Sequence, residues 1–261
     1  MNKYSDIIKN YYNGNEEDIR FTKSKGTAVE FITNMHYINK FANKGNKILE
    51  LGAGTGAYSI ELAKKGFAIN AIELVQSNLD ILNKKAEGIE NLTAEQGDAL
   101  DLSRFKDNTF DIVLSFGPMY HLFSEKDKMQ AINEAIRVGK KDGILMFAYL
   151  THSSIVWNFG VKQKQFAYLA ASMTKDGKIN DTPEEIFSTY FSEDFTKQFD
   201  GLRTKHIANV ASDGLAYAFR EYIDALTEEQ YKLFLDWHLN TCERIDHQGL
   251  SSHMLYICKK I

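Results

Sequence analysis

The sequence has few of the residues that cross-link a chain or divide it into domains. Its 261 residues include two cysteines, Cys242 and Cys258, and two prolines, Pro118 and Pro183. Two cysteines are too few for the disulfide framework of a small secreted protein. With so little proline, no low-complexity tract and no internal repeat, the chain has no obvious linker. We therefore expect one large domain, or one domain that carries an insert.

Long apolar runs and an excess of positive charge are also absent. No apolar run approaches the roughly 18 residues of a membrane-spanning helix, and the polar, acidic N-terminal stretch lacks the apolar core of a signal peptide. The net charge is −4 and the isoelectric point about 6.0, so there is no global basic field to gather nucleic acid. These features predict a cytoplasmic enzyme with no membrane partner, and they disfavour a nucleic-acid substrate.

The most informative stretch is KILELGAGTGAYSIELAK, which runs from Lys47 to Lys64. An apolar run leads into three glycines at alternate positions, Gly52, Gly54 and Gly56, and an amphipathic helical pattern follows. A strand, a glycine turn and a helix form the nucleotide-binding opening of a doubly wound α/β fold. Glycine allows positive φ there and lets a ligand lie against the main chain.

Further strand patterns follow at 67–72, 92–96, 110–115 and 144–150, with helical patterns between them. Ser77 with Asp80, and Ser124 with Asp127, are typical of helix N-termini. Gly139 is expected to end the helix before the fifth strand. Four successive alternations of strand and helix predict a parallel sheet.

The remaining segments divide the chain at 1–44, 45–150, 151–200 and 201–261. Residues 1–44 are predicted to form a helical lid that contains Tyr12 and Arg20, with Arg20 placed to meet a carboxylate; a solvated arm is the alternative. Residues 151–200 are rich in aromatic side chains and contain a helix start at 182–185. We predict a substrate cap there. The alternative is a group of helices that completes the hydrophobic core. Residues 201–261 are expected to add a strand at 203–210, helices at 214–226 and 228–243, and a last strand at 252–259.

The glycines alone do not identify the nucleotide. Gly52, Gly54 and Ala57 also satisfy the dinucleotide pattern G-x-G-x-x-A, so a nicotinamide-dependent oxidoreductase is one hypothesis. Glu50, two residues before the first glycine, opposes a pyrophosphate and favours a cation such as an α-amino group or a sulfonium. Glu73 ends the second strand, where an acidic residue accepts ribose hydroxyls, and Asp98 at the third strand suits the amine of adenine. Together these acids favour a cationic adenosyl compound.

Four segments resemble a known family. ILELGAGTGAYSIELAKKG is similar to motif I of the class I S-adenosylmethionine-dependent methyltransferases, and AIELVQSNL to their second-strand motif. QGDALDLSRF and FDIVLSFGPMYHL resemble the adenine-binding and fourth-strand motifs of a bacterial branch with small-molecule or unassigned substrates. The resemblance covers about residues 45–150. It implies a Rossmann-like α/β fold with a seven-stranded, mostly parallel sheet whose last strand is antiparallel.

The resemblance also assigns S-adenosylmethionine as cofactor and gives roles to individual residues. The methionine part would contact Glu50, Gly52, Ala53, Gly54 and Gly56; the ribose and adenine would contact Glu73, Leu74, Asp98 and Ala99; and Ser115 and Phe116 would close the pocket near the donor methyl. Ser115 to Pro118 departs from the Asn/Asp-Pro-Pro-Tyr/Phe motif of enzymes that methylate nucleic-acid amines. A small-molecule acceptor is therefore favoured.

A general base is needed only when the nucleophile carries a proton, because methyl transfer from a sulfonium is an in-line displacement. His121 and Tyr120, just past the fourth strand, are the candidate catalytic residues. His152 is a weaker candidate, and His253 is expected to be a core or rim residue. His238 and Cys242 have metal-like spacing, but no second ligand pair accompanies them, so no metal is expected.

The primary hypothesis is thus an S-adenosylmethionine-dependent methyltransferase that acts on a small molecule. A non-catalytic protein that binds the same cofactor is a third hypothesis beside the oxidoreductase. The acceptor, the methylated atom and the oligomeric state stay open at this stage.

Overall fold

The structure is a computed structural model that describes residues 3–12, 16–180 and 186–261. Its sheet has the order β3-β2-β1-β4-β5-β8-β7, with the two-residue β6 also paired to β5. The strands are β1 (Lys47–Leu51), β2 (Ala68–Glu73), β3 (Leu92–Gln96), β4 (Phe110–Ser115), β5 (Gly139–Thr151), β6 (Thr189–Tyr190), β7 (Thr204–Ala211) and β8 (His253–Lys260). β1 to β6 pair in parallel, whereas β8 is antiparallel to both β5 and β7. The predicted α/β sheet with an antiparallel last strand is confirmed, and the short β6 is an addition to it.

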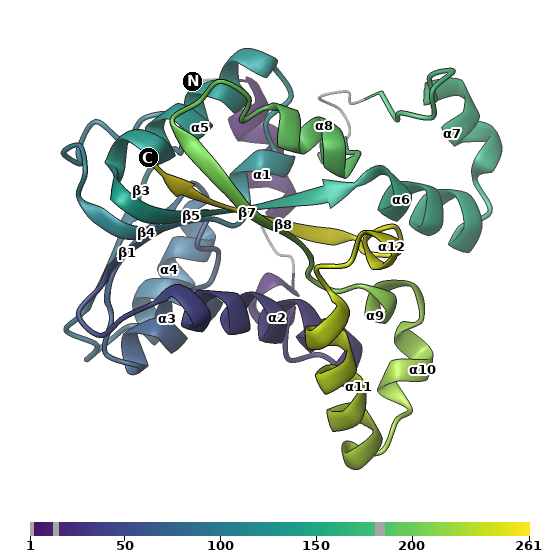
Figure 1. Ribbon diagram of the computed structural model, residues 1–261, viewed down its shortest axis with the longest axis horizontal. Coiled ribbons are helices and arrows are strands. Elements are labelled where there is room, and N and C mark those ends of the chain that lie inside the picture. The colour runs from purple at the N-terminus through teal and green to yellow at the C-terminus, as the bar shows by residue number, and fades with distance from the viewer. Residues whose placement is uncertain (1–2, 13–15, 181–185) are drawn as a thin grey trace.

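Helices cover both faces of this sheet, as expected for strands joined by helical crossovers (Figure 1). In the view of Figure 1, α2 (Lys25–Phe41), α3 (Ala57–Lys64) and α4 (Gln76–Lys85) lie on one side, while α5 (Glu125–Val138) and α8 (Ser192–Lys197) lie on the other. The remaining helical segments are α1 (Lys3–Tyr12), η1 (Glu16–Ile19), η2 (Pro118–Tyr120), α6 (His152–Ile155), the π-helical η3 (Val156–Lys162), α7 (Phe166–Ser172), α9 (Leu215–Ala218), α10 (Arg220–Asp224), α11 (Glu228–Thr241) and α12 (Ile245–Gln248). Within the described ranges, no helix is both long and apolar enough to cross a membrane.

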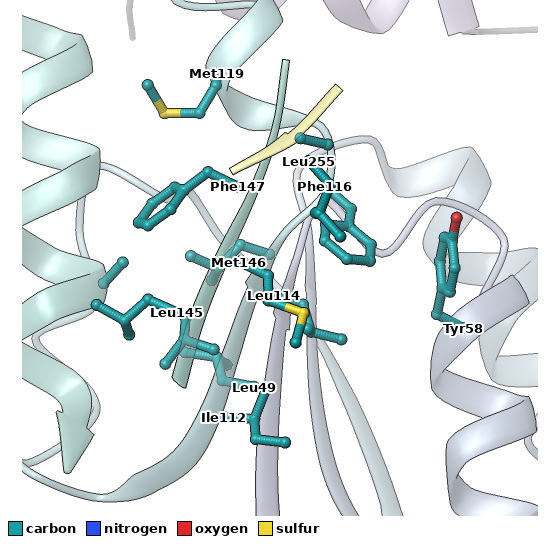
Figure 2. Packing of buried hydrophobic residues seen from close by; sticks show 14 of the residues in the cluster. Leu49, Tyr58, Ile112, Leu114, Phe116, Met119, Leu145, Met146, Phe147 and Leu255 are labelled. Atoms are coloured by element: carbon teal, nitrogen blue, oxygen red, sulfur yellow. The ribbon is translucent and has the colours of Figure 1, made fainter. Parts of the chain in front are cut away.

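The core lies where the central strands β1, β4, β5 and β8 are covered on both faces. Leu49, Leu114 and Met146 come from three adjacent strands and are fully buried (Figure 2). Strands that are buried on both faces need near-continuous apolar runs, which is why these segments do not alternate apolar and polar residues. Burying each such side chain contributes about 1.5–3 kcal/mol. The core therefore fixes the carboxyl ends of these strands, where the candidate site lies.

The predicted helix boundaries are confirmed in part. Ser124 caps α5 by accepting a hydrogen bond from the Asp127 backbone N–H, and Thr227 forms a reciprocal capping box with Gln230 at α11. The cap predicted from Ser77 and Asp80 is wrong, because Val75 is the N-cap of α4 and its N–H donates to the Glu73 carboxylate instead.

Two further predicted boundaries differ from the structure. The helix expected at 214–226 is split into α9 and α10 at Phe219. β5 begins at Gly139, earlier than the predicted 144. The helix start predicted at 182–185 lies outside the described residues.

The segment 151–200 divides into two parts that pack differently. Phe195 stacks on Tyr149 of β5 with ring centroids 4.0 Å apart, and Phe199 stacks on Tyr256 of β8 at 4.1 Å. This second part therefore belongs to the core of the sheet. Phe166 and Tyr168 of α7 are 48% and 61% exposed, and in Figure 1 α6 and α7 extend beyond the end of the sheet. The domain limits and the substrate cap stay predictions.

Candidate functional site

A cleft opens at the carboxyl ends of β1, β2, β3 and β4, where the connection from β3 to β4 crosses the sheet. In open α/β sheets, ligands bind at such a change of strand order. Two cavities make up the cleft. The outer cavity, of about 720 Å³ and partly open to solvent, is lined by residues that include Ile8, Tyr12, Glu73, Leu74, Asp98, Ala99 and His121. The inner cavity, of about 410 Å³, is lined by residues that include Glu30, Glu50, Ala53, Tyr58 and Ala148. Both are lined by Arg20, Gly52, Gly54, Phe116 and Tyr120.

The three glycines of the loop after β1 have two different roles: two of them line the cleft, and the third allows two helices to pack. Gly52, Gly54 and Gly56 all have positive φ. A Cβ on Gly56 would lie 2.2 Å from Leu82 Cδ1 of α4, and Gly56 lines neither cavity. Gly52 and Gly54 line both cavities, so a ligand can approach their main chain. Gly56, which the sequence analysis placed at the ligand with the other two glycines, thus allows α3 and α4 to pack together.

Glu73 holds this loop in place. Its Oε2 accepts a hydrogen bond from the Gly54 N–H at 2.7 Å, and its Oε1 accepts one from the Val75 N–H at 2.8 Å. The side chain is buried, although it lies at the carboxyl end of β2. Asp98 is less buried, and its Oδ1 accepts from the Leu100 N–H at 3.0 Å. Both acids line the outer cavity.

Glu50 is a fully buried carboxyl group in the wall of the inner cavity. Burial raises its pKa to about 8, and the nearby Glu73 adds to this effect, whereas the hydrogen bond from Ser59 opposes it. The protein alone therefore stabilises the ionised form of Glu50 poorly. A cation bound beside Glu50 would stabilise the carboxylate and lower this pKa.

His121 is buried in the wall of the outer cavity, with both ring nitrogens hydrogen-bonded. Its Nδ1 lies 3.0 Å from the Ile186 carbonyl oxygen, which can only accept, so Nδ1 carries the proton. Its Nε2, 3.0 Å from the Tyr12 hydroxyl, accepts from that hydroxyl. Burial lowers the pKa of His121 to about 4. The residue is a neutral hydrogen-bonding partner at neutral pH.

The predicted site residues fall into three groups. Tyr12, Arg20, Glu50, Glu73 and Asp98 lie together around the cleft, together with Gly52, Ala53, Gly54, Leu74, Ala99, Phe116, Tyr120 and His121. Ser115 is buried at the end of β4 and, like Gly56, lines neither cavity. The side chain of His152 bonds to Thr189, and that of His238 to Thr33, both away from these cavities.

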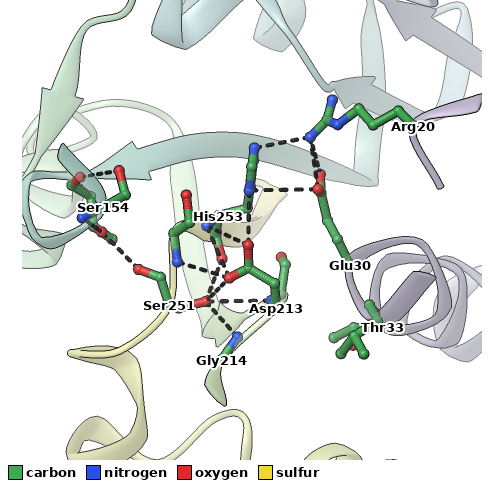
Figure 3. Close-up of polar contacts among 12 residues, drawn as sticks. Arg20, Glu30, Thr33, Ser154, Asp213, Gly214, Ser251 and His253 are labelled. Atoms are coloured by element: carbon green, nitrogen blue, oxygen red, sulfur yellow. Dashed lines mark hydrogen bonds and ion pairs between the residues drawn. The ribbon is translucent and has the colours of Figure 1, made fainter. Parts of the chain in front are cut away.

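Sequence reasoning missed a charged cluster at the inner end of the cleft, which we call the Arg20 cluster: Arg20, Glu30, Asp213 and His253 (Figure 3). Nη2 of Arg20 donates to both carboxylate oxygens of Glu30, at 3.0 and 2.7 Å, and lies 2.9 Å from His253 Nε2. His253 Nδ1 lies 2.9 Å from Asp213 Oδ2. The four residues come from the N-terminal segment, α2, the end of β7 and the start of β8, so no local motif could have revealed them.

This site geometry agrees with the comparison against known families. Residues 48–143, which contain β1 to β4 and the glycine loop, match the family model described as "Methyltransferase domain". These residues therefore form a methyltransferase domain. The match agrees with S-adenosylmethionine as the cofactor that the sequence indicated.

Relatives of this methyltransferase domain match only part of the chain. YqeM of Bacillus subtilis, named as a methyltransferase, is 33% identical over 109 residues, 41% of this chain and 43% of its own length. Glycine/sarcosine N-methyltransferase of Aphanothece halophytica is 28% identical over 134 residues, 49% of each chain. The chain thus spans about half the length of the curated relatives it matches.

A solved structure extends the similarity of fold beyond the domain. Geranyl diphosphate C-methyltransferase of Streptomyces coelicolor, crystallised with S-adenosyl-L-homocysteine, superposes with a TM-score of 0.65 at 12% identity. The superposition covers 100% of this chain and 99% of that one. The fold around the methyltransferase domain is therefore also found in a solved methyltransferase structure.

Proposed function

We propose that the protein transfers a methyl group from S-adenosylmethionine to a small-molecule acceptor by in-line displacement. The observation that carries this proposal is the position of Glu50, a buried carboxyl group next to the glycine loop. A carboxylate there repels a pyrophosphate and attracts the α-amino and sulfonium charges of the donor. This is also the reason to prefer a methyl donor over a nicotinamide dinucleotide.

The two cavities accommodate the two ends of the donor. We place the adenosine in the outer cavity, with Asp98 and Ala99 at the adenine edge, Leu74 beside the ring and Glu73 at the ribose. Each carboxylate oxygen of Glu73 has a second lone pair, so it accepts a ribose hydroxyl without releasing the loop. The methionine end lies in the inner cavity against Gly52, Ala53 and Gly54, with its amino group at Glu50 and its carboxylate at Arg20.

The N-terminal helix α1 acts as a lid in this arrangement. Ile8 and Tyr12 of α1 line the outer cavity, and the hydrogen bond from Tyr12 to His121 joins α1 to the segment after β4. Closing a lid over the donor excludes water from the reacting groups. In this account His121 fastens the lid and does not accept a proton, which revises the catalytic role predicted for it. Tyr120 lies between the two cavities and positions the acceptor.

A small molecule is the acceptor class that best fits the cleft. Two of the compared proteins are named for small acceptors, glycine or sarcosine in one and geranyl diphosphate in the other. These acceptors are methylated on nitrogen and carbon respectively, so the names do not select the atom. The net charge of −4 and the Ser115 to Pro118 sequence continue to disfavour a nucleic acid.

The test is a methyl-transfer assay with methyl-tritiated S-adenosylmethionine and a panel of small amines, alcohols, phenols and thiols. We expect S-adenosylhomocysteine to form in the presence of a panel member, and the rate to fall in Asp98→Ala at limiting donor. Reduction of NAD by a panel alcohol, without methyl transfer, would instead support the oxidoreductase. Donor binding without turnover of any member would support a non-catalytic binder.

A further inference from the structure

His253 lies beside the inner cavity, on the strand β8 that pairs with β5, and Ala148 of β5 lines this cavity. In the antiparallel pair of β5 and β8, His253 is opposite Leu150, and Leu255 is opposite Ala148, which lines the inner cavity. Residues two apart in a strand share a face. The side chain of His253, at the start of β8, therefore lies on the same face of the sheet as that of Leu255, next to the wall of the cavity. Its side chain is 19% exposed and its ring centroid lies 6.3 Å from that of Tyr120.

Asp213 fixes the orientation of the His253 ring. Its carboxylate accepts from the backbone N–H groups of Ser252 and His253 and from the Ser251 hydroxyl, at 2.8, 3.1 and 2.7 Å. Although burial opposes ionisation, hydrogen bonds from His253 and Ser251 lower the pKa of Asp213. An ionised carboxylate can only accept, so His253 Nδ1 carries the proton and Nε2 is the accepting nitrogen. The Glu30 carboxylate is also close, with Oε2 3.5 Å from Nδ1.

Arg20 covers the accepting nitrogen of His253 in this structure. Its guanidinium donates to Nε2 and to Glu30, and the same side chain lines both cavities. Glu30, Asp213 and His253 have ligand atoms within 4.8 Å of one another, a spacing that a metal ion could use. Arg20 already supplies the positive charge at this point, so the geometry favours a movable guanidinium over a metal.

We propose that the acceptor is an amine, which takes the place of the Arg20 guanidinium at Glu30 and gives its proton to Nε2 of His253. This inference rests on the proposed function, because it requires the donor's carboxylate to draw Arg20 into the inner cavity. Arg20 then leaves two carboxylates, those of Glu30 and Asp213, without a cation. A protonated amine restores the charge balance, whereas a neutral alcohol or thiol does not.

The aromatic lining of the inner cavity suits the same acceptor. Phe21, Tyr58, Phe116 and Tyr120 all line it. The faces of aromatic rings attract cations, and apolar walls exclude water from the reacting nitrogen. The cavity thus combines the carboxyl groups of Glu30 and Glu50 with several rings, as expected for recognition of an ammonium group.

The reaction is balanced with His253 as the general base. An N–H bond of the ammonium breaks and its proton binds to Nε2, which leaves the nitrogen lone pair free. That lone pair forms the N–C bond to the donor methyl as the C–S bond breaks, and the bonding electrons of C–S return to sulfur. The products are a methylated ammonium, S-adenosylhomocysteine and a protonated His253, which later releases its proton to solvent. Asp213 and Glu30 stabilise the imidazolium in the meantime.

The first test compares acceptors and variants. With the tritiated donor, we expect turnover of a panel of primary and secondary amines, including glycine, ethanolamine and phenethylamine, and none of the matched alcohols and thiols. His253→Gln should lower kcat about 100-fold, the usual contribution of a general base. Glu30→Gln should instead raise KM for the amine about tenfold with a smaller effect on kcat. His36→Gln, at an exposed position on α2, is the matched control and should match the wild type.

Turnover confined to hydroxyl or thiol compounds would overturn the amine assignment while leaving the proposed function intact. S-adenosylhomocysteine binding without turnover of any amine also counts against it. Failure of S-adenosylhomocysteine to bind would contradict the proposed function itself.

The second test needs no acceptor. In protein labelled with ¹⁵N-histidine, S-adenosylhomocysteine should shift the Nε2 resonance of His253, because Arg20 leaves that nitrogen. Arg20→Ala should shift the resonance in the same direction without the ligand, and the resonances of His36 should not move. If S-adenosylhomocysteine shifts the His121 resonances but leaves those of His253 in place, Arg20 does not uncover the base and the proposal is wrong.

Discussion

His121 and His253 both lie next to Tyr120, with ring centroids 4.9 and 6.3 Å from the tyrosine ring, but their partners differ in kind. His121 is held by a backbone carbonyl and the Tyr12 hydroxyl, both uncharged. His253 faces two carboxylates and a guanidinium. Only the second set contains charged groups. Position along the chain favours His121 as the base, whereas the surrounding charges favour His253.

The largest expected difference between the two histidines is in turnover of an amine acceptor. His253→Gln should lower kcat about 100-fold and leave the affinity for S-adenosylhomocysteine within about twofold. His121→Gln should weaken donor binding, because it loosens the lid, with a smaller effect on kcat. Steady-state kinetics beside calorimetric titration checks both variants. A large loss of kcat in His121→Gln alone would reverse the assignment.

The second prediction compares the inner cavity, which is lined by Glu50, with the outer cavity, which is not. Below pH 8, Glu50 holds a proton that a bound cationic ligand must displace, so the affinity for S-adenosylhomocysteine should rise with pH. With a pKa of about 8, Kd should fall about 20-fold between pH 6 and pH 7.5. Calorimetry across this range measures it, and Glu50→Gln should bind more weakly and without this pH dependence. A Kd that stays constant or rises with pH in the wild type would show that no cation lies beside Glu50.

The third prediction separates binding from stability within the outer cavity. Asp98→Ala should weaken S-adenosylhomocysteine binding about tenfold with little change in thermal stability, because its carboxylate is partly exposed and accepts a hydrogen bond from the Leu100 backbone N–H. Glu73→Ala removes the acceptor of two backbone N–H groups and should also lower the free energy of unfolding by about 1–3 kcal/mol. Paired titration and thermal melts of the two variants provide the check. Wild-type affinity for S-adenosylhomocysteine in both variants would show that the ligand binds elsewhere.

The smallest expected effect is that of the lid. Tyr12→Phe keeps the ring but removes the hydroxyl that donates to His121, and one such hydrogen bond contributes about 0.5–1.5 kcal/mol. Binding of S-adenosylhomocysteine should weaken about threefold, mainly through faster dissociation, which stopped-flow displacement measures. Tyr11→Phe is the matched control on the same helix. Equal effects of the two substitutions would argue against the Tyr12–His121 contact as the closure of the lid.

Local patterns were enough to predict most of the residues that we place around the donor. The glycine loop, Glu50, Glu73 and Asp98 lie at or just past the carboxyl ends of strands that the sequence pattern predicts, and parallel strands bring these ends to one edge. The same reasoning could not place Glu30, Asp213 and His253. Arg20 and His253 are 233 positions apart, and only the antiparallel β8 brings them together.

Other errors have similar physical causes. Ser77 has the sequence of a cap, but the Glu73 carboxylate already accepts the N–H at the start of α4. Gly56 looks equivalent to Gly52 and Gly54, yet its missing Cβ makes room for Leu82 on the next helix. In each case a contact with a residue outside the local pattern decides the outcome.

The most direct test of the account is calorimetric titration of the protein with S-adenosylhomocysteine, run beside NAD at the same pH. The account predicts micromolar binding of S-adenosylhomocysteine, loss of most of that affinity in Glu50→Gln, and no binding of NAD. Binding of NAD without S-adenosylhomocysteine would contradict it, because a cleft with Glu50 at its inner end would then hold a pyrophosphate and not a cation.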